Sequence, residues 1–148
     1  MNPRYTVAFD RTVGRWFYPL HRRLYLLTGG VIGHRSGMGP MLLMTTTGRR
    51  TGERRTTPLL YMPDGDDYFV VGSNGGRDRP PAWLLNLEAT PGAEIQVGRR
   101  TMTVRADVLR GADAETVWPR LTDHYAGWGH YQGLTEREIP VVRLVTSP

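Results

Sequence analysis

Apolar and polar residues alternate over residues 94–97 and 101–109, which is typical of β-strands with one face on a core and one in water, and short apolar runs elsewhere also indicate strands. Only a few residues separate several of these segments, and short connections favour antiparallel pairing. Tight turns are expected at "PDGDD" and "GRR". The predicted strands are residues 41–47, 56–62, 68–72, 94–97, 101–109 and 140–146.

A period of three to four residues indicates helices elsewhere. Over residues 7–27 the apolar side chains gather within about 100° of a helical wheel and arginines lie opposite, which predicts an amphipathic helix. Pro19 should kink or divide this helix. A short helix is predicted over residues 82–88, and a longer one over residues 113–124, interrupted by Pro119.

A glycine-rich stretch separates the N-terminal helix from the first strand. Residues 28–40 hold five glycines and one proline, a composition typical of a flexible connection. We therefore expect two parts: an N-terminal amphipathic helical segment with its connection, residues 1–40, and a β-domain, residues 41–148. Six strands with connecting helices predict a mainly β (α+β) fold, namely a small antiparallel barrel with a cleft for a flat ligand.

Composition and charge narrow the function. Of the 148 residues, 39% are hydrophobic and 22% are charged, which suits a globular domain, and the net charge of +5 favours an anionic partner. The absence of cysteine excludes disulfides and thiolate chemistry and is consistent with a cytoplasmic location. No apolar run reaches membrane-spanning length and no export signal is recognisable, so we expect neither export nor a transmembrane helix.

The common signatures of metal, nucleotide and nucleophile chemistry are absent from the sequence. The four histidines show no metal-ligand spacing, and "GRRTGE" is too short for a P-loop and lacks its lysine. Neither a dinucleotide-binding GxGxxG after a strand nor a GxSxG nucleophile motif occurs. What remains is arginine, glycine and aromatic residues, a combination suited to a large planar anion that carries the reactivity itself.

The densest positive charge lies between the first two predicted strands. The segment "LLMTTTGRRTGERRTTPLLYM", residues 42–62, places Arg49, Arg50, Arg54 and Arg55 around one turn. A lone basic turn is more often a solvated surface loop. Here a second glycine-rich loop, "SNGG", and a helix that begins "AW" follow in the sequence, and together they favour an anion site.

Three segments resemble a known family. At "TTTGRRTGERRTTPLLYM", "SNGGRDRPPAWLLNLEATPGAEIQVG" and "REIPVVRL" the sequence resembles the deazaflavin-dependent nitroreductase family of actinobacteria, over roughly residues 41–145. These enzymes use coenzyme F-420, an 8-hydroxy-5-deazaflavin with a phosphate and an oligoglutamate tail. The resemblance implies a split β-barrel of the flavin-binding type. It also implies hydride transfer from the reduced cofactor to a quinone such as menaquinone, or to a nitro-bearing or other electrophilic heterocycle.

The resemblance also implies roles for individual residues. Arg49, Arg50 and Arg55 match the positions that hold the phosphate and acidic tail, while Gly48 and Gly52 shape that turn. Relatives often carry lysine at the position of Asn74, so a contact with the anion is expected to be lost there or transferred to Arg77. The match of Arg54 is the weakest, with surface charge as its alternative role. The loop beside the deazaflavin and the start of the helix that flanks it match Ser73, Asn74, Gly75, Gly76, Arg77, Ala82 and Trp83.

The segment "HYAGWGHYQGLTERE" matches a stretch that supplies tyrosines around the substrate in the nitroreductase relatives. Tyr125 and Tyr131 match two of these tyrosines, and Trp128 stands where a third is found, so the substrate pocket differs at that ring. Tyr131 is the preferred proton donor or orienting hydroxyl. A packed aromatic stripe on one helix face is the alternative for all three, and a core anchor is the alternative for Trp83.

Two alternative functions and the role of the N-terminal helix stay open at this point. The same barrel could hold FMN, or the hairpin could belong to a non-enzymatic module that binds anions or nucleic acid. No long basic stripe extends beyond the hairpin, which argues against nucleic acid as a partner, and no metal is expected. The N-terminal helix has three candidate roles: covering the core, contacting a second subunit, or lying on the inner face of the cell membrane.

Overall fold

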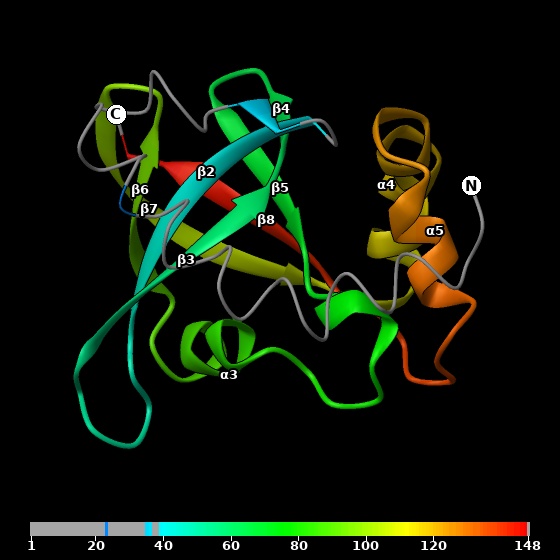
Figure 1. Cartoon of the computed structure of the whole chain (residues 1–148), viewed down its shortest axis with the longest axis horizontal. Coiled ribbons are helices and arrows are strands. Elements are labelled where there is room, and N and C mark those ends of the chain that lie inside the picture. Colours follow the sequence, from blue (N-terminus) through cyan, green and yellow to red (C-terminus); the bar gives the residue numbers. More distant parts are fainter. Residues whose placement is uncertain (1–22, 24–34, 37–38, 148) are drawn as a thin grey trace.

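The computed structural model describes residues 23, 35–36 and 39–147 of the chain (Figure 1). The predicted N-terminal amphipathic helix, apart from Arg23, lies outside the described residues, as does most of the glycine-rich connection. The division of the chain at residue 41 stays a prediction, although strand pairing already begins ahead of that position.

Within these residues eight strands form one antiparallel sheet. A 3-10 turn, η2 (Asn74–Gly76), and the helices α3 (Ala82–Ala89), α4 (Gly111–His124) and α5 (Gly127–Gln132) connect them. The strands in chain order are β1 (Arg35–Ser36), β2 (Gly39–Thr47), β3 (Arg54–Leu60), β4 (Met62–Asp64), β5 (Asp67–Val71), β6 (Gly92–Val97), β7 (Arg100–Leu109) and β8 (Val141–Thr146).

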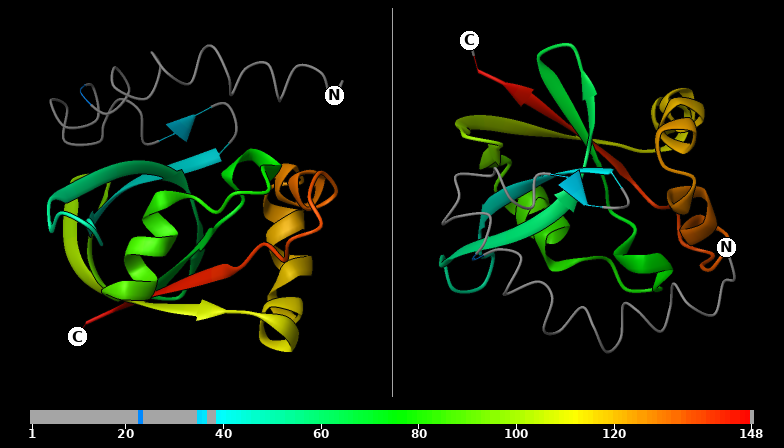
Figure 2. Two further views of the ribbon diagram at one scale, coloured as in Figure 1. Left: turned by 90° about the horizontal axis from the view of Figure 1, so that it is seen from below. Right: turned by 45° about the horizontal axis from the view of Figure 1, so that its top comes forward.

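The sheet curls into an open barrel (Figures 1 and 2). Its hydrogen-bonded order runs β3, β2, β6, β7, β8, β5, β4, with β1 paired to the start of β2. The two ends of this order, β3 and β4, are consecutive strands joined at Tyr61, whose N–H donates to Pro40 O at 3.2 Å. No ladder joins β3 to β4 among the described strands, so the barrel is open at this corner. The predicted antiparallel barrel is confirmed.

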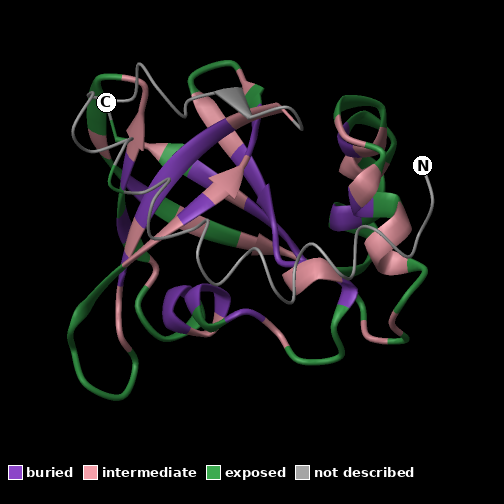
Figure 3. Ribbon diagram, in the orientation of Figure 1, coloured by how far each residue is buried: buried purple, intermediate pink, exposed green. Residues whose placement is uncertain are grey.

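Alternation along β5 and β8 divides the apolar side chains between two cores. Val70 and Leu144 belong to the inner core of the barrel, which α3 covers at one open end (Figures 2 and 3). Phe69 and Val141, their alternates on the same strands, belong to a second core together with α4 and α5. Each fully buried side chain of this size contributes about 1.5–3 kcal/mol. The period of two therefore determines which side of the sheet each helix covers.

Two strand predictions need correction. The segment predicted as one strand over residues 56–62 divides at Tyr61, because β3 pairs with β2 whereas β4 pairs with β5. Parts of the predicted flexible connection are paired instead: β1 pairs with the first residues of β2. The remaining strand and helix boundaries agree with the prediction within two residues.

Two helix predictions also differ from the structure. Pro119 lies inside α4 without ending it, although an internal proline costs a helix about 3 kcal/mol. Ala114 and Leu121 of α4 are both buried in the second core, and this burial offsets the cost of the proline. Helix α5, in the aromatic and glycine-rich stretch, was not predicted because its glycines mask the helical pattern.

Candidate cofactor and substrate site

The turn between β2 and β3, residues 48–53, is closed by its own backbone. The Gly48 N–H donates to Glu53 O at 2.7 Å, and the Gly52 N–H donates to Gly48 O at 2.8 Å. Gly52 has a φ of 72°, a conformation that favours glycine. A Cβ on Gly48 would lie 3.0 Å from Glu53 O, which is tighter than ordinary packing. Both glycines therefore shape this turn.

The four arginines of the hairpin differ in their partners. Arg55 pairs with Glu53 at 2.7 Å, and Arg54 approaches an acidic side chain of β6 at 3.7 Å. The side chains of both pairs are about half exposed or more, and ion pairs of this kind contribute only about 0.2–1 kcal/mol. An anionic ligand can therefore displace Glu53 from Arg55 at small cost in free energy. Arg49 and Arg50 are exposed and have no ion-pair partner among the described residues.

Asn86 of α3 anchors the start of this turn. Its side chain is 4% exposed, and its Oδ1 accepts a hydrogen bond from the Arg49 N–H at 3.1 Å. Its Nδ2 donates to Thr46 Oγ1 at 3.1 Å, and Thr46 is also buried. One buried amide thus connects α3, the end of β2 and the first arginine of the turn. The backbone of Arg49 is held, while its guanidinium stays exposed.

The loop after β5 has an unusual backbone. Asn74, Gly75 and Gly76 have positive φ values of 47°, 65° and 77° in succession, a region that glycine and asparagine tolerate best. The Asn74 Nδ2 donates to Arg79 O at 2.8 Å, so this side chain closes the loop. The Asn74 side chain is thus used for a hydrogen bond within the loop, while Arg77 is exposed.

This loop lies directly against the end of α5. A Cβ on Gly76 would lie 2.8 Å from Tyr131 O and 2.9 Å from Leu134 Cβ, so only glycine fits at this contact. Ser73, at the start of the loop, is buried with 8% exposure. The structure thus brings the predicted cofactor loop next to the predicted proton donor, Tyr131, a relation that sequence spacing alone does not show.

The aromatic residues of α4 and α5 divide between core and surface. Trp128 is 3% exposed and belongs to the second core. Its ring meets Tyr125 edge-on, with centroids 5.5 Å apart, and stacks on His124 at 6.2 Å. Trp128 is therefore a core residue in this structure, which corrects its predicted place as a ring lining the substrate pocket. Tyr125 and Tyr131 are half-buried and remain candidates to contact a substrate.

Helix α3 lies between the arginine turn and the glycine loop (Figures 1 and 2). It begins at Ala82, which is exposed, and Asn86 follows four residues later, about 6 Å along the helix axis. Trp83 is 6% exposed and packs in the inner core, so its role as a core anchor is established by the structure. The exposed cations of the turn could hold an anionic group, and the glycine loop presents close backbone on the other side of α3.

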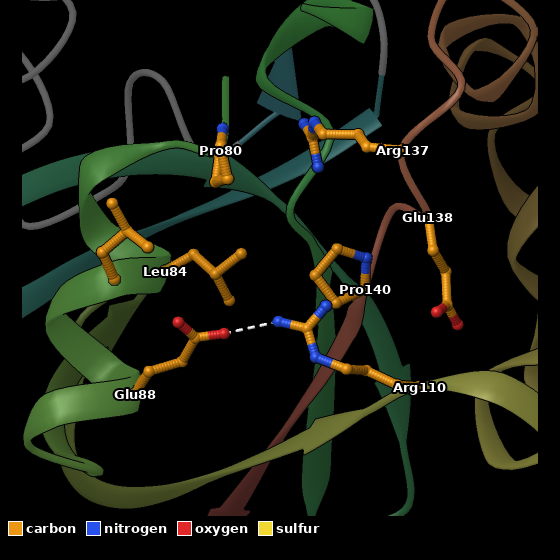
Figure 4. A pocket seen from close by; sticks show the side chains of 8 residues that line it. Pro80, Leu84, Glu88, Arg110, Arg137, Glu138 and Pro140 are labelled. Atoms are coloured by element: carbon orange, nitrogen blue, oxygen red, sulfur yellow. Dashed lines mark hydrogen bonds and ion pairs between the residues drawn. The ribbon is translucent and has the colours of Figure 1, made fainter. Parts of the chain in front are cut away.

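One cavity of about 250 Å³ lies between α3 and the segments around residues 110 and 137–140, and it is lined in part by Arg137, whose guanidinium also binds carbonyls of the glycine loop (Figure 4). Glu88 and Arg110 form an ion pair within it. None of the predicted site residues lines this cavity. The predicted site residues lie instead at the arginine turn and the glycine loop: exposed cations lie at the turn, and the backbone of the loop contacts the helix that carries Tyr131.

Sequence reasoning missed two residues of this region. Asn86 is a lone polar residue in the apolar stretch "WLLNL", and that interruption is a signal that could have identified it. Arg137 donates hydrogen bonds to carbonyls of the glycine loop from a position 60 or more residues away in the chain. No local pattern marks a contact of that kind.

The described residues form neither a metal-ligand cluster nor a membrane-spanning helix. In the part of the chain that the structure describes, no cluster of three histidine, aspartate or glutamate side chains is placed to hold a metal ion. None of the helices in this part combines the length and the apolar character needed to cross a bilayer.

Comparison with known proteins identifies the family. The family description "F420H(2)-dependent quinone reductase" matches residues 17–146. An F420H(2)-dependent quinone reductase of Mycobacterium tuberculosis is 42% identical over 139 residues, which cover 91% of this chain and 93% of that protein. The solved F420-H2 dependent reductase FDR-A is 33% identical, with a TM-score of 0.65, over 71% of this chain and 93% of its own.

A second solved structure, described as a domain-swapped dimer, is 29% identical with a TM-score of 0.68, over 90% of this chain and 99% of its own. These matches confirm the split-barrel fold and the deazaflavin-dependent class predicted from the sequence. They do not support the alternatives with FMN or nucleic acid. The chain belongs to the F420H(2)-dependent quinone reductase family, a family of oxidoreductases.

Proposed function

We propose that the chain transfers a hydride from reduced coenzyme F-420 to a quinone of the menaquinone class. Family membership supports both the cofactor and the class of acceptor. The observation that carries the proposal at the level of residues is the arrangement around α3. An arginine turn anchored by Asn86 lies on one side of this helix, and a glycine loop in contact with Tyr131 lies on the other.

The arginine turn binds the anionic part of the cofactor. Arg49 and Arg50 present guanidinium groups without a competing carboxylate among the described residues, and Arg55 exchanges Glu53 for the ligand. A guanidinium grips phosphate or carboxylate oxygens through two parallel hydrogen bonds. The tail of the cofactor carries both kinds of group, so three arginines around one turn suit it. This binding should weaken as salt increases.

The glycine loop and the start of α3 flank the planar ring. With no side chain on Gly75, a ring can approach the backbone of the glycine loop closely at that residue, while Gly76 packs against α5. Ala82 adds a small exposed contact, and Trp83 supports the helix from the inner core. The bound reduced deazaflavin supplies the hydride, so the protein has to align donor and acceptor and exclude water.

Tyr131 supplies the proton that the acceptor requires. A quinone that accepts a hydride carries a negative charge on oxygen, and one proton completes the hydroquinone. Tyr131 lies on the helix whose backbone touches the glycine loop, and this contact supports a place for its side chain beside the proposed cofactor ring. Its hydroxyl donates this proton directly or orients a water that does so. Tyr125, half-buried at the end of α4 and in ring contact with Trp128 of α5, is the second tyrosine proposed to border the acceptor.

The purified protein tests this function directly. Oxidation of reduced coenzyme F-420, followed by its absorbance, should begin when a menaquinone analogue is added. Binding titrations with coenzyme F-420, FMN and a short oligonucleotide should show saturable binding of the first alone. An inactive protein that binds FMN or the oligonucleotide more tightly would overturn the proposal. The same assay with a nitroimidazole tests nitro reduction, for which the core position of Trp128 leaves one fewer ring to contact the substrate.

We also propose a location for the enzyme, at the cytoplasmic face of the cell membrane. The amphipathic pattern of residues 7–27 supports it, since apolar rings lie opposite arginines and the acceptor is a lipid-soluble quinone. Deleting residues 1–30 should abolish co-sedimentation with anionic vesicles. Unchanged co-sedimentation would exclude this segment as the anchor, and no co-sedimentation of the full chain would exclude the location.

A further inference from the structure

Arg137 lies in the connection between α5 and β8, residues 133–140, and it binds the glycine loop through three carbonyl groups. Its Nε donates to Arg77 O at 2.8 Å, and its Nη2 donates to Gly72 O at 3.0 Å and Ser73 O at 2.9 Å. These acceptors lie on both sides of the three residues with positive φ. One guanidinium therefore spans the loop from its start to its end.

The same connection is tied to the helix that carries Tyr131. The Gln132 Nε2, at the end of α5, donates to Arg137 O at 2.8 Å, and the Gln132 Oε1 accepts from the Ile139 N–H at 2.9 Å. Thr135 adds a hydrogen bond to Asp78, just after the glycine loop, at 2.7 Å. The glycine loop and α5 are thus joined through the connection as well as by the direct contact at Gly76.

The charged guanidinium of Arg137 donates its hydrogen bonds to neutral carbonyl groups. Among the described residues it forms no ion pair with a carboxylate, and its guanidinium is half-buried. Desolvation lowers the pKa of Arg137, the nearby Asp78 raises it, and Arg110 lowers it. A cation placed in this way is costly unless its N–H groups are satisfied, which the three carbonyls provide. Lysine could not replace it, because a single ammonium cannot match the planar fork of arginine.

We propose that Arg137 is a positioning residue for hydride transfer: it holds the glycine loop in the shape that receives the deazaflavin ring and keeps Tyr131 in register with it. This inference rests on the proposed function. Arg137 contacts the loop through its carbonyls, so it acts on the cofactor ring through the loop. The arginine turn, on the other side of α3, binds the tail without it.

The division between ring and tail makes the role testable. Arg137→Met keeps the apolar stem and removes the fork. It should weaken binding of coenzyme F-420 about tenfold, and it should weaken binding of the ring-only compound, 8-hydroxy-5-deazaflavin with its ribityl chain alone, by the same factor. Arg49→Ala should weaken binding of the full cofactor and leave the ring-only compound within about twofold. A general loss of structure would also weaken both ligands, so the comparison applies to an Arg137→Met variant that thermal denaturation shows to be folded.

Turnover gives a second readout. At saturating cofactor, Arg137→Met should lower kcat at least about tenfold while KM for the quinone stays within about twofold, because donor and proton donor lose their alignment. Arg120→Met is the matched control, since it makes the same substitution at an arginine that pairs with Asp64 at 2.8 Å, away from the glycine loop. It should retain wild-type affinity and kcat.

The outcomes separate this inference from the proposed function. A wild-type protein that neither binds nor oxidises the reduced cofactor would refute the function itself. An active wild type together with a folded Arg137→Met of unchanged kcat and unchanged ring-only affinity would refute the positioning role alone. If Arg137→Met does not fold, Arg137→Lys keeps the charge and should still lose about threefold or more in kcat. Wild-type kcat in that variant would also overturn the inference.

Discussion

Replacing Asn86 with alanine should destabilise the domain and loosen the arginine turn at the same time. The substitution removes two hydrogen bonds, one from the Arg49 N–H and one to Thr46 Oγ1, each at 3.1 Å. Asn86 is 4% exposed, so water does not readily enter the space that its amide leaves. The Arg49 N–H lies in an exposed turn and can be hydrated, whereas the hydroxyl of Thr46, 1% exposed, cannot.

The expected loss of stability follows from the two groups that lose a hydrogen bond, the Arg49 N–H and the Thr46 hydroxyl. Each hydrogen bond contributes about 1 kcal/mol, and a buried hydroxyl without a partner adds about 1 kcal/mol or more. The free energy of unfolding should therefore fall by about 2–3 kcal/mol, a large part of the 5–15 kcal/mol typical of a domain. Releasing the turn adds an ordering cost to cofactor binding, and about 1.4 kcal/mol of such cost corresponds to a tenfold weaker affinity.

Urea denaturation measures the first effect, and a fluorescence titration with coenzyme F-420 measures the second. Thr46→Val is the matched control, because it removes the same hydroxyl contact and leaves the Asn86 bond to Arg49 in place. It should cost about 1–2 kcal/mol of stability and leave affinity within about twofold. If Asn86→Ala changes the free energy of unfolding by less than about 0.5 kcal/mol and leaves affinity unchanged, the anchoring argument is wrong.

Three further predictions concern the turn, the proton donor and the loop. Arg49→Ala should weaken cofactor binding about five- to tenfold at low salt. Arg55→Ala should weaken it less, because that guanidinium already pairs with a glutamate at 2.7 Å. If titrations at two salt concentrations show full affinity in both variants, the tail binds elsewhere. Tyr131→Phe should lower kcat at least about tenfold with cofactor affinity nearly unchanged, and equal turnover in both forms would remove this hydroxyl from the mechanism. Gly76→Ala should lower the free energy of unfolding by about 2–4 kcal/mol in thermal denaturation, because its Cβ would lie 2.8 Å from a backbone oxygen at a φ of 77°. Gly98→Ala is the control: with a φ of 60° and open space around it, it should cost only about 1 kcal/mol. Equal losses in the two variants would show that the contact with α5 is unimportant.

Much of the fold can be predicted from the sequence, because the two-residue period of strands and the 3.6-residue period of helices each show within a short stretch of chain. The alternation along β6 and β7 identifies them as strands, and the predicted helix at residues 82–88 agrees with α3 (Ala82–Ala89) to within a residue. The exceptions occur where a distant partner overrides the local signal. Tyr61 divides a predicted strand because the chain changes its pairing partner there, and Pro119 stays within α4 because the helix is buried against the second core.

The candidate site also combines features that the local sequence predicts with features that only distant contacts decide. The types of residue in the arginine turn and the glycine loop predict an anion site, since charge and backbone freedom are properties of the residues themselves. Trp128 shows the opposite case. Its spacing from Tyr125 suits a pocket and a packed stripe equally well, and only the position of β5 and β8 beneath α5 shows that the ring is buried.

By itself, the sequence determined the strand and helix types, the cationic turn and the family resemblance, because each depends on residues that are close together in the chain. Only the tertiary structure decided which of these features meet. It joined Asn86 to Arg49 across 37 residues and Arg137 to Gly72 across 65, and it placed Gly76 against Tyr131. Contacts over such separations form when the sheet curls and the helices pack on its two sides, and no local pattern encodes them.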